Sequence, residues 1–113
     1  MFKKEFRLRK QKDFENVFDK GFYFSDNFLS LKTAKNGLPI SRFGFIVSKK
    51  VSKKAARRNR VKRLLRESVR LTQKNIKPGF DAVFISKTGI VGKSFEEVNL
   101  VVEKLLKRSG LVL

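Results

Sequence analysis

The segment from Lys49 to Arg70 constrains the fold of this chain more than any other part of the sequence. It carries eleven Lys or Arg residues against one acid, and it therefore holds ten of the eighteen net positive charges of the 113-residue chain. Its apolar residues recur at helical spacing, which predicts an amphipathic helix from about Ser52, as its N-cap, to Thr72. One face of this helix must be buried: Val61, Leu64, Leu65, Ser68, Val69, Leu71 and Thr72.

The remaining segments alternate between helical and strand patterns. Phe14, Val17 and Phe18 indicate a first helix within residues 10–20, and the aromatic run 22–33 reads as two strands around a turn at residues 25–27. Further strands are expected at 42–48 and 80–86, and Ser94 with Glu97 forms a capping box at the start of a last helix. The first three strands predict an antiparallel meander. Residues 1–113 are therefore expected to form one α+β domain, an α/β sandwich with about three helices on a four-stranded sheet.

Composition excludes several classes of protein. The chain has no cysteine and no histidine, so it lacks thiolate zinc ligands and the commonest general base, and no metal site or catalytic residue is predicted. It has no apolar run long enough to span a membrane and no secretory signal, so we expect a cytoplasmic protein without a membrane partner or an obligate protein partner. A net charge of +18 calls for a polyanionic partner, and nucleic acid is the first candidate.

The charged face of the basic helix forms a continuous stripe of Asn59, Lys62, Arg63, Arg66 and Arg70. Most charged helix faces are simply solvated, but those mix signs, whereas this stripe has only Glu67 to share among its cations. Like charges four residues apart cost about 0.2–0.5 kcal/mol each. Glu67 is expected to pair with Arg63 or Arg70. Asn59 either binds a phosphate, a 2′-OH or a neighbouring loop, or it is solvated.

Cations also occupy the start of the basic helix, where the helix dipole disfavours them: Lys53, Lys54, Arg57 and Arg58. A phosphate bound to the first turn would explain this placement. Arginine outnumbers lysine along the helix, and because its planar fork reads paired acceptors and stacks on bases, structured RNA is favoured as the ligand.

Aromatic residues are the second ingredient of single-strand recognition, because bases stack on them. The contexts of Phe43, Phe45, Phe84 and Phe95 predict core positions. Phe14 and Phe18 lie one turn apart and leave two interpretations open: they plug the sheet, or they line a groove beside it.

Several motifs together resemble one family. They are Ser48-Lys49-Lys50, Ala55, and the run Arg58-Asn59-Arg60-Val61-Lys62-Arg63-Leu64-Leu65-Arg66-Glu67, with Phe6-Arg7-Leu8, Asp13-Phe14, Val17-Phe18, Gly44, Val47 and Asp81-Ala82-Val83 around them. This pattern is similar to that of the protein subunit of bacterial ribonuclease P. The resemblance implies a non-catalytic subunit of an endoribonuclease that removes the 5′ leader from precursor tRNA, with the metal-dependent chemistry, and hence Mg²⁺, belonging to the RNA subunit.

The resemblance also implies roles for individual residues. The RNA subunit would be held by Arg57, Arg58, Asn59, Arg60, Lys62, Arg63, Arg66 and Arg70. The leader of precursor tRNA would follow Phe14, Phe18, Ser48, Lys49, Lys50 and Lys54. Strands 42–48 and 81–86 would be parallel neighbours in a mixed sheet, joined through the basic helix by a left-handed crossover, which is a rare connection. Leu31 stands where some members carry an aromatic residue facing the leader.

Two other functions compete with this one. A stand-alone structured-RNA-binding protein, such as a ribosomal protein, would need the basic stripe but no groove for a leader. A protein nuclease would need clustered carboxylates or a histidine, and the ten acids are scattered along the sequence.

Overall fold

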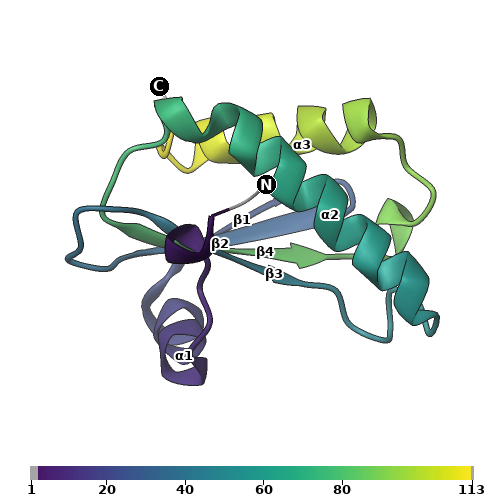
Figure 1. Cartoon of the computed structure of the whole chain (residues 1–113), viewed down its shortest axis with the longest axis horizontal. Coiled ribbons are helices and arrows are strands. Elements are labelled where there is room, and N and C mark those ends of the chain that lie inside the picture. The colour runs from purple at the N-terminus through teal and green to yellow at the C-terminus, as the bar shows by residue number, and fades with distance from the viewer. Residues whose placement is uncertain (1–2, 113) are drawn as a thin grey trace.

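Four strands form one mixed sheet, and helices lie on both of its faces (Figure 1). The computed structural model describes residues 3–112. Within these residues there are three α-helices, α1 (Gln11–Lys20), α2 (Ala55–Thr72) and α3 (Phe95–Arg108). The strands are β1 (Phe22–Asp26), β2 (Leu29–Lys35), β3 (Arg42–Ile46) and β4 (Phe80–Ser86), and short 3₁₀ turns occupy Lys4–Phe6 (η1), Gln73–Asn75 (η2) and Thr88–Ile90 (η3). The predicted α+β architecture and element order are confirmed.

The strand order is β1-β2-β4-β3, so the predicted meander is wrong at its third strand. β3 does not pair with β2; it pairs in parallel with β4, and β4 pairs antiparallel with β2. The physical reason is the length of α2, which carries the chain back along the sheet so that β4 can enter between β2 and β3. The parallel pairing implied by the family resemblance is therefore confirmed, and the left-handed sense of the connection stays a prediction.

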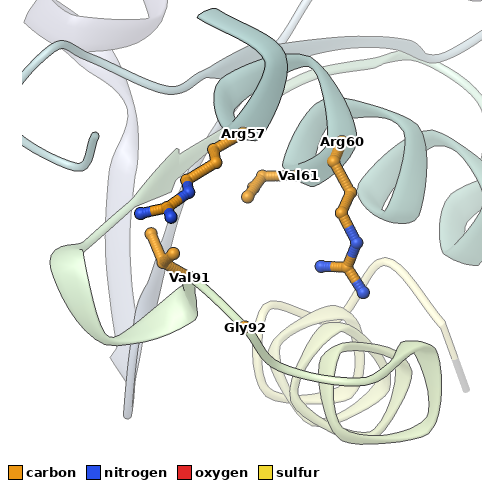
Figure 2. A pocket seen from close by; sticks show the side chains of 5 residues that line it. All are labelled: Arg57, Arg60, Val61, Val91 and Gly92. Carbon is orange, nitrogen blue, oxygen red and sulfur yellow. The ribbon is translucent and has the colours of Figure 1, made fainter. Parts of the chain in front are cut away.

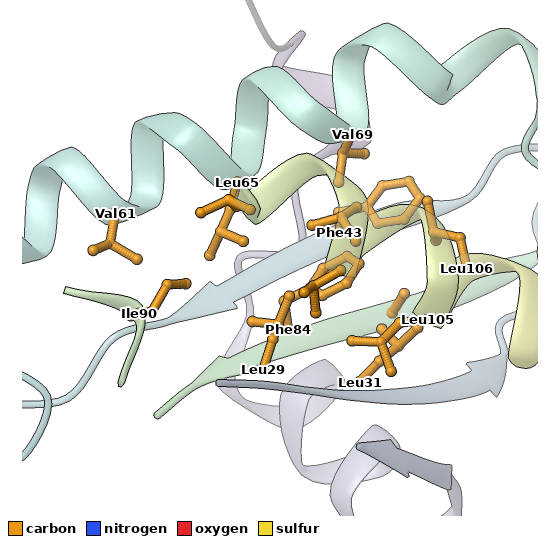
Figure 3. Packing of buried hydrophobic residues seen from close by; sticks show 14 of the residues in the cluster. Leu29, Leu31, Phe43, Val61, Leu65, Val69, Phe84, Ile90, Leu105 and Leu106 are labelled. Carbon is orange, nitrogen blue, oxygen red and sulfur yellow. The ribbon is translucent and has the colours of Figure 1, made fainter. Parts of the chain in front are cut away.

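The larger core lies between the sheet and the layer formed by α2 and α3 (Figure 3). Val61, Leu65 and Val69 of α2 are buried there against Phe43 and Phe84 of the sheet. Leu71, which the helical spacing placed on the buried face, is instead 55% exposed. It lies at the edge of the apolar sector, and a helix edge is buried only where a neighbouring element covers it.

Within residues 3–112, α1 is the one helix that packs on the opposite face of the sheet (Figure 1). A second, smaller core forms here from Leu8, Val17, Ala34 and Val83. Phe14 packs against this core while remaining half-buried. Because one short helix cannot cover four strands, part of this face stays open beside α1.

Several local boundaries differ from the sequence-based expectations. The N-cap of α2 is Lys54 rather than Ser52, and the Ser52 hydroxyl accepts a hydrogen bond from the Lys54 N–H (3.3 Å) just outside the helix. The β1–β2 turn is centred on Asn27, whose φ of 48° is left-handed, so β1 runs on through Asp26. The Ser94–Glu97 capping box is confirmed, with the Glu97 N–H donating to the Ser94 hydroxyl (3.2 Å).

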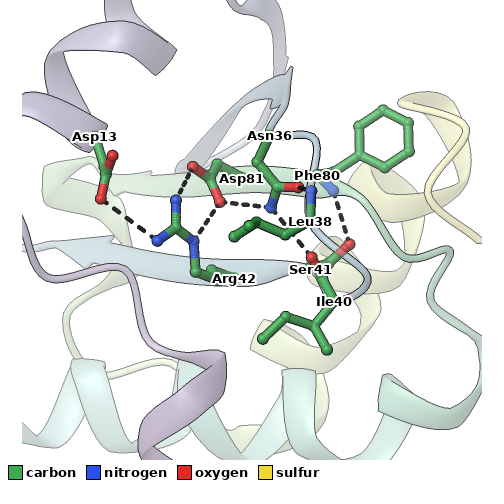
Figure 4. Close-up of polar contacts among 8 residues, drawn as sticks. All are labelled: Asp13, Asn36, Leu38, Ile40, Ser41, Arg42, Phe80 and Asp81. Atoms are coloured by element: carbon green, nitrogen blue, oxygen red, sulfur yellow. Dashed lines mark hydrogen bonds and ion pairs between the residues drawn. The ribbon is translucent and has the colours of Figure 1, made fainter.

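A polar network ties α1 to the sheet (Figure 4). Arg42 donates two hydrogen bonds to the buried carboxylate of Asp81, at 2.9 and 2.7 Å, and lies 3.4 Å from Asp13 of α1. The Asn36 amide donates to the same Asp81 carboxylate (2.9 Å) and to the carbonyl of Ile40 (3.1 Å). One guanidinium thus joins α1, β3 and β4.

Candidate nucleic-acid interface

The predicted stripe of α2 lies away from the core, as its spacing requires. Asn59, Arg63 and Arg70 are exposed, whereas Lys62 and Arg66 are half-buried. The Asn59 side chain forms no hydrogen bond with any residue of the range 3–112, so its amide is open to a ligand. We refer to the exposed residues of the stripe, Asn59, Arg63 and Arg70, as the crest of α2. Lys62 and Arg66 lie on a partly covered flank.

Glu67 pairs with Arg70 and not with Arg63. Two nitrogens of the Arg70 guanidinium donate to the two carboxylate oxygens of Glu67. This pairing lowers the pKa of Glu67 and raises that of Arg70. The expected intrahelical ion pair is confirmed, and it leaves Arg63 as an exposed cation of the stripe without an acid partner among the described residues.

The start of α2 has the features of an anion site, although one of its cations also serves the fold. Its first turn contains no acidic residue, and no side chain caps it. Lys53, Lys54 and Arg57 are exposed. The Arg58 guanidinium instead donates to the backbone carbonyls of Ser52 (2.9 Å) and Lys53 (3.0 Å), so it closes the loop before the helix.

Arg57 and Arg60 lie together on one flank of α2, beside the loop that leads into α3 (Figure 2). Both terminal nitrogens of Arg60 approach the carbonyl oxygen of Lys93 at 3.4 Å. Arg60, expected only to bind RNA, therefore also connects α2 to the segment before α3.

A groove of about 220 Å³ lies on the other flank of α2. It is bounded by the N-terminal segment, by α1, by β3 and by α2, with the lining residues Arg7, Leu8, Arg9, Phe14, Phe43, Gly44, Phe45, Lys62 and Arg66. Burial lowers the pKa of the Arg66 guanidinium, and the positive charge of Arg7 acts in the same direction. Several cations thus converge on a partly apolar groove, which favours an anionic ligand that also has apolar faces.

The groove joins residues that the family resemblance assigns to different ligands. Phe14 was expected on the leader path, whereas Lys62 and Arg66 were expected to hold the RNA subunit. Sequence reasoning missed Arg7 and Arg9 as site residues. The alternation of Arg7, Leu8 and Arg9 was the available signal, since Leu8 is buried and both arginines retain solvent access.

Phe18 lies on the open part of the sheet face and is 37% exposed. The ammonium of Lys32 lies 5.4 Å from the centre of its ring and donates a hydrogen bond to its carbonyl (3.1 Å). Tyr23 lies on β1, beside the strand β2 that carries Lys32. It is 56% exposed, and its hydroxyl is hydrogen-bonded to that of Ser30 (2.8 Å). Hydrogen bonds from Ser30 and Ser25 lower the pKa of Tyr23. Sequence reasoning did not identify Lys32 or Tyr23 as site residues. The two lie nine positions apart in the chain and become neighbours only when β1 pairs with β2.

Leu31 does not face this surface. It is completely buried in the larger core on the α2 and α3 side of the sheet, so it cannot contact a ligand on the α1 side. The neighbouring Lys32 has the outward position, because successive residues of a strand point to opposite faces. The expectation that Leu31 occupies a leader-facing position is wrong.

The remaining predicted leader residues lie in the loop between β3 and α2. Ser48, Lys49 and Lys50 are exposed there, and Lys54 is the exposed N-cap of α2. None of these four lines the groove that contains Phe14. They form an exposed basic segment past the end of β3.

No metal site is formed within residues 3–112, because His, Cys, Asp and Glu side chains nowhere gather there in a group of three or more. The helices in this range include none with the length and apolar character needed to cross a membrane.

Comparison with known proteins gives one family. The family model for ribonuclease P matches residues 2–110. The ribonuclease P protein component of Clostridium botulinum (strain Loch Maree / Type A3) is 41% identical over 109 residues, covering 96% of this chain and 97% of that protein. That of Caldanaerobacter subterraneus subsp. tengcongensis is 39% identical over 105 residues, with 93% and 90% covered.

Solved structures agree with the sequence matches. The ribonuclease P protein of Staphylococcus aureus superposes with a TM-score of 0.88 at 25% identity, covering 96% of this chain and 98% of that one. The ribonuclease P protein from Thermotoga maritima gives a TM-score of 0.82 at 35% identity, with 90% and 96% covered. With sequence and fold both matched over nearly its whole length, this chain belongs to the ribonuclease P protein family.

Proposed function

We propose that this protein is the non-catalytic subunit of ribonuclease P, and that it binds the RNA subunit through α2 and the 5′ leader of precursor tRNA in a groove beside α1. The observation that carries the proposal is the pairing of two surfaces on one helix. An exposed basic crest, with Arg63 and Asn59, adjoins a groove in which Arg66 and Lys62 meet the aromatic ring of Phe14. A general RNA-binding protein would need only the crest.

The crest of α2 suits folded RNA, because its arginines can each fork onto phosphate oxygens. Lys53, Lys54 and Arg57 add a second anion-binding area at the start of the helix, where backbone N–H groups also point outward. We assign the crest, Lys53 and Arg57 to the RNA subunit, together with Arg58, Arg60 and Arg70, and Lys54 to the leader. Arg58 and Arg60 would act partly through the loops they hold in place.

A single-stranded leader suits the α1 side of the sheet. Phe18 and Tyr23 offer exposed rings on which bases can stack, and Lys32 is paired with Tyr23 in the strand register. Where the leader passes α2, Lys62 and Arg66 would bind its phosphates. Lys49 and Lys50 would bind the part of the leader that continues beyond β3. Lys62 and Arg66 would then contribute to both ligands.

The hydrolysis itself is assigned to the RNA subunit. Within residues 3–112 no three His, Cys, Asp or Glu side chains gather to hold a metal ion, and Mg²⁺ is assigned to the RNA subunit together with the chemistry. The protein would instead neutralise phosphate charge, so that the RNA and its substrate associate at low Mg²⁺ concentration. We place this activity in the cytoplasm.

The direct test is precursor-tRNA cleavage by the cognate RNA subunit at low Mg²⁺ concentration, with and without this protein. Addition of the protein should raise the cleavage rate and the affinity for substrates that carry a leader. If neither quantity changes, the proposed function is wrong. A control reaction with mature tRNA as competitor separates leader binding from binding of the tRNA body.

The leader contact can be tested at Phe18, whose exposure makes replacement compatible with folding. Phe18→Ala should weaken the affinity for leader-bearing substrate by about fivefold to 150-fold, because stacking on an aromatic ring contributes roughly 1–3 kcal/mol per base. Affinity for mature tRNA should stay unchanged. Equal losses for both RNAs would remove Phe18 from the leader path.

The interaction with the RNA subunit can be tested at Arg63. Arg63→Ala should weaken binding of the RNA subunit and reduce the slope of log affinity against log salt by about 0.7–0.9 for each phosphate that the variant no longer neutralises. Lys35→Ala is the matched control, since it removes one exposed positive charge outside α2. If both variants lower the slope equally, the crest acts only through net charge.

A further inference from the structure

A pocket of about 370 Å³ lies between α2 and the loop that leads into α3 (Figure 2). It is lined by Arg57, Arg60, Val61, Val91 and Gly92, and we refer to it as the α2–α3 pocket. Its volume falls within the roughly 300–1,000 Å³ typical of small-ligand sites. The groove beside α1 uses Lys62 and Arg66, which lie on the opposite flank of α2, so the two sites are separate.

The lining of the α2–α3 pocket combines an apolar floor with two guanidinium groups. The floor is formed by Val61, which is 1% exposed, and by the half-buried Val91. The side chains of Arg57 and Arg60 extend from α2 on either side of Val61 (Figure 2). An inorganic anion would make no use of the two valines. A planar base would use them, because its apolar face can pack on the valines. The guanidinium groups can then stack on the base or bind its phosphate.

The α2–α3 pocket is also partly organised before any ligand binds. The Arg60 guanidinium is held at the carbonyl of Lys93 and keeps donors to spare, since arginine carries five. Arg57 forms no ion pair with any residue of the described range. Gly92 has a φ of +83°, and a Cβ atom there would meet nothing within 4 Å, so the loop side of the pocket is open.

We propose that the α2–α3 pocket binds one unstacked nucleotide of the RNA subunit, with the base on Val61 and Val91 and the phosphate on Arg57. This inference rests on the proposed function and deepens it. The RNA subunit is chosen over the leader because the pocket faces away from the groove beside α1. RNA is chosen over an acidic peptide because two arginines flank an apolar floor, an arrangement that can hold a planar base together with its phosphate.

The first test uses the full chain and three probes: adenosine monophosphate, inorganic phosphate and an acidic peptide. Methyl resonances of Val61 and Val91 are followed by nuclear magnetic resonance during titration with each probe. The nucleotide should shift both methyl groups in a saturable way, and phosphate should not. Equal shifts with phosphate, larger shifts with the peptide, or no shift with the nucleotide would each overturn the proposal.

The second test fills the pocket without changing charge. Val91→Phe should weaken RNA-subunit binding by about tenfold, the size expected when one base can no longer stack, and leave the salt slope unchanged. Leu100→Phe is the matched control, because Leu100 lies exposed on α3 outside the pocket. Binding of Val91→Phe at the level of the control would overturn the proposal.

A further variant guards against misfolding of Val91→Phe. Arg57→Gln removes the cation that holds the phosphate, so it should abolish the methyl shifts caused by the nucleotide and reduce the salt slope of RNA binding by about 0.7–0.9. Retained shifts would overturn the proposal. These outcomes are separable from failure of the proposed function itself, in which the unmodified protein would not bind the RNA subunit at all.

Discussion

Gly44 lies on β3 beneath the aromatic ring of Phe14. A Cβ atom at position 44 would lie 2.5 and 2.6 Å from two ring carbons of Phe14, far closer than carbon atoms can approach. The missing side chain therefore lets the ring of Phe14 reach the sheet and line the groove with Arg66. The shape of the candidate leader site therefore depends on residue 44 having a hydrogen atom in place of a side chain.

Replacing Gly44 with alanine should displace the Phe14 ring. We expect Gly44→Ala to lower the free energy of unfolding by about 1–3 kcal/mol, as overpacking does, when measured by urea titration. In a Phe14→Ala background the same change should cost almost nothing, because the ring that it would strike is absent. A double-mutant cycle measures this coupling. Strictly additive losses would contradict the contact.

Single residues also show where sequence reasoning reached its limit. The pattern of α2 placed Val61, Leu65 and Val69 correctly in the core. It could not place Leu71, because exposure at the edge of an apolar sector depends on a neighbour from elsewhere in the chain. Leu31 failed for a different reason, since a shift of one position along a strand reverses the face.

At the scale of elements, α1 is positioned by the network around Arg42. The guanidinium binds Asp81, which is 2% exposed, through two hydrogen bonds, and it reaches Asp13 at 3.4 Å. The bond to Asp81 is the main cause of the raised pKa of Arg42, so the guanidinium stays charged across the accessible pH range. The Arg42 guanidinium therefore holds α1, which forms one wall of the groove, in place throughout this pH range.

Loss of Arg42 should therefore cost far more than loss of Asp13. Arg42→Ala leaves the Asp81 carboxylate buried with only the Asn36 amide, which costs on the order of 3 kcal/mol for a partly buried pair. Asp13→Ala breaks one partly exposed contact and should cost less than about 1 kcal/mol. Thermal or urea unfolding distinguishes the two, and equal losses would rule out this division of roles.

The capping box of α3 should make stability depend on pH. Hydrogen bonds from the Ser94 backbone and hydroxyl hold the pKa of Glu97 below its ordinary value. A carboxylate whose pKa is lower in the folded state stabilises the protein above its unfolded pKa, and the contribution disappears as pH falls through the folded value. The stability difference between the unmodified protein and Glu97→Gln should therefore shrink as the solution is acidified below about pH 4.

Glu96→Gln provides the control for this experiment. Glu96 is also an exposed acid in the first turn of α3, but it makes no capping-box bond to Ser94. It shares the favourable interaction with the helix dipole and lacks the hydrogen bonds. Identical pH profiles for the two variants would show that the dipole, and not the capping box, sets the behaviour of Glu97.

At the scale of the whole molecule, the element order and the β1–β2 pairing could be predicted from the sequence, but the pairing of β3 and β4 could not. Local periodicity locates β3 and β4 without saying which strands they pair with, and the family resemblance supplied their parallel arrangement. The groove beside α1 draws Arg7, Gly44 and Arg66 from three distant segments. The basic stripe of α2 could be predicted because one continuous helix supplies all of its residues.

The charge of the whole molecule sets a balance between folding and RNA binding. Twenty-eight Lys and Arg residues face ten acids within overall dimensions of 36 × 28 × 25 Å. At about 0.01 M salt the Debye length of about 30 Å spans the molecule, so most cations repel one another, whereas at about 1 M it falls to about 3 Å. Salt should therefore stabilise the free protein and weaken its complex with RNA.

We expect the melting temperature of the free protein to rise by several degrees between about 0.01 M and 0.5 M NaCl, while affinity for RNA falls over the same range. The rise should be reduced most by neutralising exposed lysines just before α2, as in Lys49→Gln, Lys53→Gln and Lys54→Gln combined. The matched control neutralises three exposed lysines elsewhere, Lys12, Lys35 and Lys104. A melting temperature independent of salt, or equal effects of the two triple variants, would show that the charge clustered just before α2 is not what destabilises the free protein.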